Sequence, residues 1–520
     1  MKYHSTRNKS LKYTSKEAIQ QGLSPEGGLF VPESIPKVTR DELKKWTSLN
    51  YRERAKKIFG LFLTDYSKEE LDSCVDEAYT SAKFSSPEIA PVVSMDEKLH
   101  ILELWHGPTS AFKDMALQIL PQFLTTAVQS SPDPKEIVIL TATSGDTGKA
   151  AMVGFQDVPG TRIMVFYPRQ GVSSMQKLQM ATQEGNNVSV VAVNGNFDHA
   201  QTGVKQIFQN EELKENMSRN GLGFSSANSI NWGRLAPQIV YYFSAYLDLL
   251  KQGSIEFGQV INVVVPTGNF GNILAAWYSR KMGLPLGRLI CASNDNKVLT
   301  DFIQTGVYDR RREFHPTISP SMDILISSNL ERLLYELSGR NDVQVNEWMK
   351  QLSENGYYKL EGAALEELQS IFWGGFATEQ QTRDAISDTF KKNAYTLDPH
   401  TGVGKWVYDR YKEETGDNRI TLLVSTASPF KFPGDVLQAI QDNGTVENVV
   451  KENRTEESGL AANNDNNATT DDLQILEQLS KISGMDIPKP LENLGEKAVR
   501  HTDECEIDQM LDHVSSFMGI

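Results

Sequence analysis

Lys113 is the residue whose surroundings point most directly to chemistry. It follows the stretch HGPTSAF at 106–112 and precedes Asp114 and a run of apolar residues. Gly107 and Pro108 predict a turn, and the apolar run predicts a helix that Asp114 caps. Desolvation at such a junction lowers the pKa of an ammonium group and frees the amine as a nucleophile or base. The residues therefore allow Schiff-base chemistry. They also allow a surface lysine at a helix N-terminus.

Two loops join a predicted strand to a predicted helix and could bind anions through backbone N–H groups. The loop PTGNFGN, at 266–272, follows the β-branched run 260–265, and its two glycines permit close approach of a ligand. It matches neither the GxxxxGK[ST] nor the GxGxxG nucleotide pattern. The loop TATSGDTGK, at 141–149, is either an N-capped turn or an anion site built from its hydroxyls. Asp146 would repel a carboxylate there unless it caps the helix.

Two further clusters could contribute ligands. The segment NSINWGR, at 228–234, places a hydroxyl, amides and a guanidinium group before a long apolar helix. Arginine offers a planar fork for phosphate, so the segment is either a phosphate clamp or a helix cap with one exposed arginine. The segment STASPFKFP, at 425–433, follows the buried run 420–424. Its hydroxyls either bind a ligand or cap the turn.

The elements that must position these residues change along the chain. From about residue 100, short apolar runs alternate with helical segments, which predicts parallel sheets covered by helices. Ligands bind such sheets beyond the carboxyl ends of the strands. The predicted divisions are an N-terminal domain at 1–95, a catalytic α/β region at 96–304, a helix-rich insertion or cap at 305–400, a return to the core at 401–450, a disordered loop at 451–475 and a C-terminal helical segment at 476–520.

Composition narrows the class of protein. A net charge of −15 argues against nucleic acid and acidic membranes as partners, so an anionic substrate would need a local basic pocket. Cys74, Cys291 and Cys505 have neither metal-ligand nor disulfide-framework spacing, which fits a reducing compartment. No apolar run approaches the roughly 18 residues of a membrane span, and the first residues lack a signal-peptide core. We expect a cytoplasmic protein whose oligomeric state the sequence does not predict.

These segments together resemble one enzyme family, the threonine synthases. HGPTSAFKDMALQ, SGDTG, NSINWGR, PTGNFGN and STASPFKFP occur in family order, and EAIQQGLSPEGGLFVP resembles the family's N-terminal domain. The resemblance implies the β-family (fold type II) architecture with pyridoxal 5'-phosphate as cofactor. It implies Lys113 as the Schiff-base residue, and a cofactor site at Gly268, Asn269, Phe270, Asn272 and Thr426. It implies substrate contacts from Ser144, Thr147, Ser229, Asn231 and Arg234.

The resemblance also implies a reaction. Threonine synthases convert O-phospho-L-homoserine and water to L-threonine and phosphate, with the lysine as proton shuttle. Thr426 would bond the pyridine nitrogen and leave it unprotonated, whereas Ser428 stands where the family commonly has histidine. His106 either assists proton transfer or stabilises its turn. Two alternatives are another β-family lyase, such as a serine or threonine dehydratase, and a catalytically silent binding protein. The phosphate clamp argues against the first and Lys113 against the second.

Overall fold

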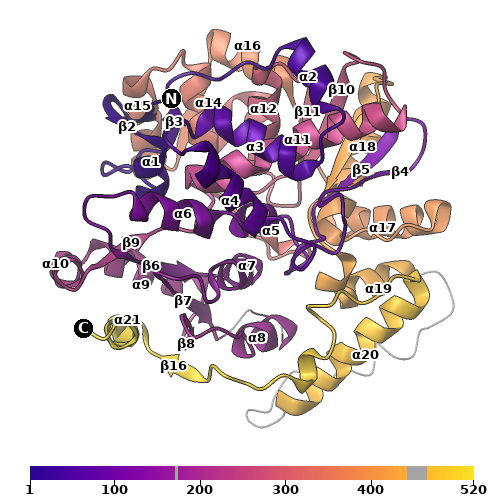
Figure 1. Ribbon diagram of the computed structural model, residues 1–520. Coiled ribbons are helices and arrows are strands. Elements are labelled where there is room, and N and C mark those ends of the chain that lie inside the picture. Colours follow the sequence, from indigo (N-terminus) through magenta and orange to yellow (C-terminus); the bar gives the residue numbers. More distant parts are fainter. Residues whose placement is uncertain (144, 170–171, 173, 442–464) are drawn as a thin grey trace.

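Two parallel sheets hold the loops singled out by the sequence (Figure 1). The computed structural model describes residues 1–143, 145–169, 172, 174–441 and 465–520. The larger sheet has the strand order β14-β11-β10-β15-β5-β4, and the smaller has the order β16-β8-β7-β6-β9. This arrangement confirms the predicted α/β class with parallel sheets flanked by helices.

The larger sheet is parallel except at one edge. Its parallel strands are β5 (Leu99–Glu103), β10 (Ile261–Pro266), β11 (Leu286–Ser293), β14 (Phe372–Phe376) and β15 (Thr421–Ser425). The short strand β4 (Val92–Ser94) pairs antiparallel with β5. Every residue of β10 and β15 is buried, as expected for central strands covered on both faces. The loops that follow these two strands are therefore anchored to the buried core.

The smaller sheet is built from β6 (Glu136–Ala142), β7 (Thr161–Pro168), β8 (Val188–Val193), β9 (Leu222–Ser225) and β16 (Asp503–Cys505), all parallel. Its surrounding helices are α7 (Asp146–Phe155), α8 (Ser174–Ala181), α9 (Phe197–Gln209), α10 (Glu211–Arg219) and α21 (Met510–Met518). The C-terminal segment thus returns to this sheet and adds an edge strand, as the yellow ribbon of Figure 1 shows.

Helix α11 (Trp232–Gln252) is the central helix of the core, and it contacts α3 (Tyr51–Phe62), α5 (Asp114–Leu117) and α12 (Gly271–Met282). It is buried along most of its length. The other helices of this half are α6 (Leu120–Gln129), α13 (Val298–Thr305), α18 (Pro399–Thr415) and α19 (Pro433–Gln441). Because α11 begins within the segment 228–234, the packing of this helix fixes where Arg234 lies.

The N-terminal region packs on the same core. It contains the sheet β1 (Tyr3–Ser5), β2 (Asn8–Tyr13) and β3 (Phe30–Pro32), with α1 (Ser15–Gln21), α2 (Arg40–Trp46) and α4 (Lys68–Ala78). One hydrophobic cluster runs from Tyr3 to Val424 without a break between regions. The buried guanidinium of Arg54 pairs with Asp248 of α11 at 2.7 Å. Residues 1–95 therefore brace α11.

Two predicted divisions differ in detail from the structure. The region 305–400 is helix-rich, with α14 (Leu330–Leu337), α15 (Asp342–Asn355), α16 (Gly362–Ile371) and α17 (Glu379–Asn393) beside the hairpin β12 (Val307–Asp309) and β13 (Tyr357–Lys359). It also supplies β14, which pairs with β11, so the insertion is part of the main sheet.

The predicted loop 451–475 needs a correction. Residues 451–464 lie outside the described part of the chain, and α20 (Asp465–Ser483) already begins within the predicted loop. Leu476 and Leu479 are buried against the core, and this anchor supports a helix that extends back into the polar stretch. Within the described ranges, the helices that are long enough to cross a bilayer lack the necessary apolar character.

Candidate active site

The loops after β5 and β15 meet and bring Lys113 beside Thr426. The Phe112 N–H donates to the Thr426 carbonyl at 2.8 Å, and the Ser428 N–H donates to the Ser110 carbonyl at 3.0 Å. These two bonds form an antiparallel bridge between chain segments more than 300 residues apart. Ser110 adopts a left-handed φ of 57°, which is unfavourable for a residue with a side chain and occurs often at functional sites.

Lys113 lies at the centre of this junction. Its Nζ donates to Ser321 Oγ at 3.0 Å and lies 3.8 Å from Asp146 Oδ2. The side chain is only 11% exposed. Burial lowers the pKa of the Lys113 ammonium group, the nearby Asp146 carboxylate opposes that shift, and the Lys431 and Arg234 cations add to it. The predicted desolvation is thus confirmed, and the surface-lysine alternative is wrong.

Asp114 does not cap the following helix. Lys113 occupies the cap position of α5, and Asp114 is its first helical residue. The Asp114 carboxylate folds back and accepts hydrogen bonds from the Thr109 N–H at 2.8 Å and the Thr109 hydroxyl at 2.7 Å. Burial raises the pKa of Asp114 to about 6, although these hydrogen bonds act in the opposite direction. Its role is to close the turn that carries Lys113.

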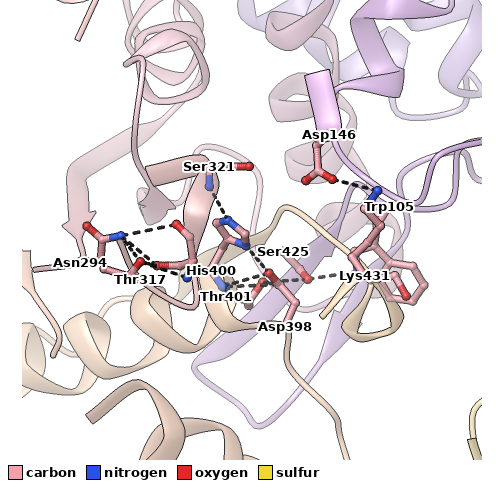
Figure 2. A network of polar contacts seen from close by, with 12 residues as sticks. Trp105, Asp146, Asn294, Thr317, Ser321, Asp398, His400, Thr401, Ser425 and Lys431 are labelled. Atoms are coloured by element: carbon pink, nitrogen blue, oxygen red, sulfur yellow. Dashed lines mark hydrogen bonds and ion pairs between the residues drawn. The ribbon is translucent and has the colours of Figure 1, made fainter. Parts of the chain in front are cut away.

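Lys431 is a site residue that the sequence interpretation missed. It lies in the 3-10 helix η2 (Pro429–Lys431), and its Nζ is 2.9 Å from Asp146 Oδ1 (Figure 2). Burial would raise the pKa of Asp146, but Lys431 and Lys113 hold it well below its usual range. Asp146 is therefore an ionised bridge between two lysines. No local pattern could have paired positions 146 and 431, because only the fold brings the two loops together.

The first anion loop is only partly described. Ser144 lies outside the described residues. Thr147 is half-buried in the first turn of α7, next to the ionised Asp146. Gly145 occupies the cap position of α7, so the helix does not use Asp146 as its cap. The carboxylate that seemed unsuited to an anion site is thus neutralised by Lys113 and Lys431.

Arg234 is buried, and its charge is close enough to Lys113 to affect the pKa of that lysine. Its guanidinium donates to the Ala227 carbonyl, whereas Nε is buried without a hydrogen-bond partner among the described residues. Burial lowers the pKa of Arg234 to about 10, and Asp114 opposes the shift. An exposed capping arginine, the alternative left open by the sequence, is therefore wrong. A buried guanidinium with an unused donor is suited to an anionic ligand.

Asn231 and Ser229, which the resemblance grouped with Arg234, form hydrogen bonds within the protein. The Asn231 side chain accepts from the Gly233 N–H and donates to the carbonyls of Ile19 and Ser226. Its oxygen caps α11 and both amide protons are used, so it positions the segment and has no donor left for a substrate. Ser229 is half-buried, and its carbonyl accepts from the Asn329 amide at 3.2 Å.

The loop 266–272 lies under a segment from the 305–400 region. Ser327 Oγ donates to the Gly268 carbonyl at 2.8 Å, and the Asn329 N–H donates to the Asn269 carbonyl at 3.1 Å. Phe270 is buried with a left-handed φ of 63°, whereas Asn269 is exposed. This conformation turns the chain sharply into α12.

Asn272 offers an unused donor in the first turn of α12. Its Oδ1 accepts hydroxyl protons from Tyr241 at 2.6 Å and Tyr242 at 2.5 Å. Its Nδ2 is buried and has no protein partner in the part of the chain that the structure describes. Because a buried donor without a partner is unfavourable, this atom points to a ligand that completes the site.

If this loop holds the cofactor that the family resemblance implies, Gly268→Ala should weaken its retention roughly tenfold, because an added Cβ would lie 2.5 Å from the Ser321 carbonyl and displace the loop or the neighbouring segment. Gly271→Ala is the matched control, since its Cβ would meet Asn329 and Gln238 only at 3.4 Å. Equilibrium dialysis of both variants against pyridoxal phosphate measures the effect. Equal retention in both would show that the close contact is unimportant.

His106 has partners for both ring nitrogens. Nε2 lies 2.7 Å from Glu103 Oε2, and Nδ1 lies 3.2 Å from Ser85 Oγ. The ring also stacks on Trp105. These contacts favour the turn-stabilising alternative for His106 over a part in proton transfer.

Comparison with known proteins agrees with this geometry. Residues 2–79 match the family model for the threonine synthase N terminus, and residues 85–369 match that for pyridoxal-phosphate dependent enzymes. Threonine synthase from Schizosaccharomyces pombe is 36% identical over 459 residues, which cover 83% of this chain and 87% of that protein. The chain belongs to the threonine synthase family. The family is one of pyridoxal-phosphate-dependent enzymes, so the cofactor of this chain is pyridoxal 5'-phosphate.

Solved structures of the family have the same fold. The structure of threonine synthase from yeast superposes with a TM-score of 0.84 at 31% identity and covers 100% of this chain and 99% of that one. The pyridoxal-phosphate-bound threonine synthase from Brucella melitensis gives a TM-score of 0.83 at 31% identity, with 99% of each chain covered. Human threonine synthase-like 1 is 41% identical over 442 residues, 83% of this chain, and the match spans 58% of that longer protein.

Proposed function

We propose that this chain is a threonine synthase that converts O-phospho-L-homoserine and water to L-threonine and phosphate. The observation that carries the proposal is a group of buried cations: Lys113 and Lys431 flank the ionised Asp146, and Arg234 is close enough to Lys113 to lower its pKa. Buried cations in excess over anions require an anionic ligand. A cofactor phosphate and a phosphorylated amino acid together supply such charge in an otherwise acidic protein.

The residues present fit pyridoxal phosphate. Lys113 provides a desolvated amine, and Thr426 lies beside it through the bridge between the two loops. The orphaned Asn272 amide and the loop Gly268-Asn269-Phe270, whose close contact with Ser321 excludes a larger residue at 268, would hold the rest of the group. When bound, the cofactor withdraws electrons from the substrate's Cα–H bond.

The remaining roles belong to the protein. Lys113, as a neutral amine, would take protons from the substrate carbons and return them. Arg234, Lys431 and Ser229 would hold the substrate phosphate before and after its bond breaks. Thr147 and Ser144 are assigned to the substrate α-carboxylate, and the ion pair of Asp146 with Lys431 limits the repulsion between Asp146 and that carboxylate.

Phosphate release from O-phospho-L-homoserine by the purified protein, with threonine formed in equal amount, tests the proposed function. O-phospho-L-serine and L-serine serve as comparison substrates. We expect measurable turnover of phosphohomoserine and little of the other two compounds. In phosphohomoserine the phosphate is on the γ-oxygen, whereas phosphoserine carries it one carbon closer and serine has none for the cationic subsite to bind. Deamination of serine without phosphate release would instead assign the chain to the dehydratase alternative, and binding without any turnover would indicate a silent protein.

A further inference from the structure

Beyond Lys113, a buried hydrogen-bonded pair connects the start of α18 to the active lysine. Asp398, at the cap of α18, is fully buried, and its Oδ2 lies 2.8 Å from His400 Nδ1 (Figure 2). On the other side of the ring, the Ser321 N–H donates to His400 Nε2 at 3.2 Å. Because Nε2 accepts a hydrogen bond, the imidazole proton sits on Nδ1 and donates to Asp398. The two hydrogen bonds therefore fix the ring in one orientation.

We propose that the Asp398–His400 pair positions Ser321 so that its hydroxyl, and not Asp146, is the nearest partner of the Lys113 amine. The inference rests on the proposed role of Lys113. Ser321 Oγ lies 3.0 Å from Nζ, and the nearest Asp146 oxygen lies 3.8 Å away. A hydroxyl accepts from an ammonium ion and donates to a neutral amine, so it serves both states. A carboxylate stabilises only the ammonium form.

The charges around Lys113 come from every element packed against it. Asp146 lies on α7, Lys431 on η2, Arg234 on α11 and Asp114 on α5. Of these, Asp146 is the carboxylate close enough to form an ion pair with Lys113. If Ser321 moved away, Lys113 could close the remaining gap to Asp146 and stay protonated. The position of Ser321 thus decides whether Lys113 is available as a neutral amine.

Asp398 also connects, through Thr401, to Ser425 at the end of β15. Thr401 Oγ1 contacts both Asp398 Oδ1 and Ser425 Oγ, the latter at 3.1 Å, and Trp105 Nε1 donates to Ser425 Oγ at 3.1 Å. Ser425 directly precedes Thr426. Asp398 therefore ties the 305–400 region, which carries Ser321, to the strand end that carries Thr426. This gives the helix-rich insertion a defined part in the site.

His400→Leu is the informative variant, because it keeps the size of the side chain and removes the acceptor for Ser321. We expect Lys113 to approach Asp146, so that attachment of pyridoxal phosphate requires a higher pH. In a plot of attachment rate against pH, the rising part, here called the limb, should move to higher pH by about one unit. At any pH below the limb, attachment should then be about tenfold slower. The measurement follows the visible band when full-length, cofactor-depleted protein is mixed with pyridoxal phosphate. It does not depend on the identity of the substrate.

Three further variants complete the test. His400→Gln retains an oxygen acceptor and should largely restore the original limb. Tyr411→Phe removes a partly buried hydrogen bond to Asp417 at the other end of α18 and should lower Tm without moving the limb. Ser321→Ala removes the hydroxyl directly and should move the limb upward even if His400→Leu fails to fold. An unchanged limb in Ser321→Ala, or in His400→Leu with a lowered Tm, would overturn the proposal and leave the pair a purely structural role.

Discussion

Lys113→Ala is expected to lose turnover by several orders of magnitude while the protein remains folded. The amine at this position is the proposed nucleophile and proton carrier, and an alanine can replace neither function. Among the described residues, the Lys113 amine contacts Ser321, Asp146 and the ring of Phe112, so its removal breaks few structural contacts. Phosphate release from phosphohomoserine and thermal unfolding, measured on the same preparation, separate loss of chemistry from loss of fold.

Borohydride reduction of the cofactor-loaded protein locates the reactive amine independently. Peptide mapping should place the label on Lys113. Lys149 is the most informative competitor, because burial lowers its pKa to about 7. Its Nζ, however, already donates to the Gln179 carbonyl and to Gln183 Oε1. A label on Lys149 or Lys431 would refute the assignment of Lys113.

Arg234→Met should lower kcat/KM for phosphohomoserine by about 30–150-fold, equivalent to roughly 2–3 kcal/mol for a buried charge-assisted contact. Methionine keeps most of the buried stem and removes the charge, which limits the effect on folding. Arg234→Lys keeps a charge without the planar fork, so it should rescue only part of the activity. Steady-state kinetics and the visible absorbance of the cofactor are measured for both variants.

The control for Arg234 is Asn231→Ala, since the structure assigns that side chain to the cap of α11. It should reduce Tm, whereas KM for phosphohomoserine in the folded variant should change little. Full activity in Arg234→Met would refute the phosphate contact. Loss of cofactor from Arg234→Met without a specific substrate defect would move Arg234 from the substrate subsite to the cofactor site.

The local sequence determined much of this protein. Runs such as 136–142 and 261–266 are apolar and β-branched, so they predict buried parallel strands whatever surrounds them. The glycine-rich loops follow those strands, and both strand and loop are short-range features. Lys113 could be chosen because its neighbours already predict desolvation. The five motifs from Lys113 to Thr426 also occur in family order, which made the resemblance specific.

The tertiary structure decided which of these residues share a site and in what state. Lys431 neutralises Asp146, and His400 reaches Lys113 through Ser321, although these residues lie far apart in the chain. Asn231 matched the expected clamp in sequence, but its amide is consumed by contacts with Ile19 and Ser226. Contacts such as Lys431 with Asp146 depend on which loops the folded sheets bring together. Hydrogen bonds and ion pairs act over a few ångströms in space, and local sequence patterns carry no record of contacts between distant segments.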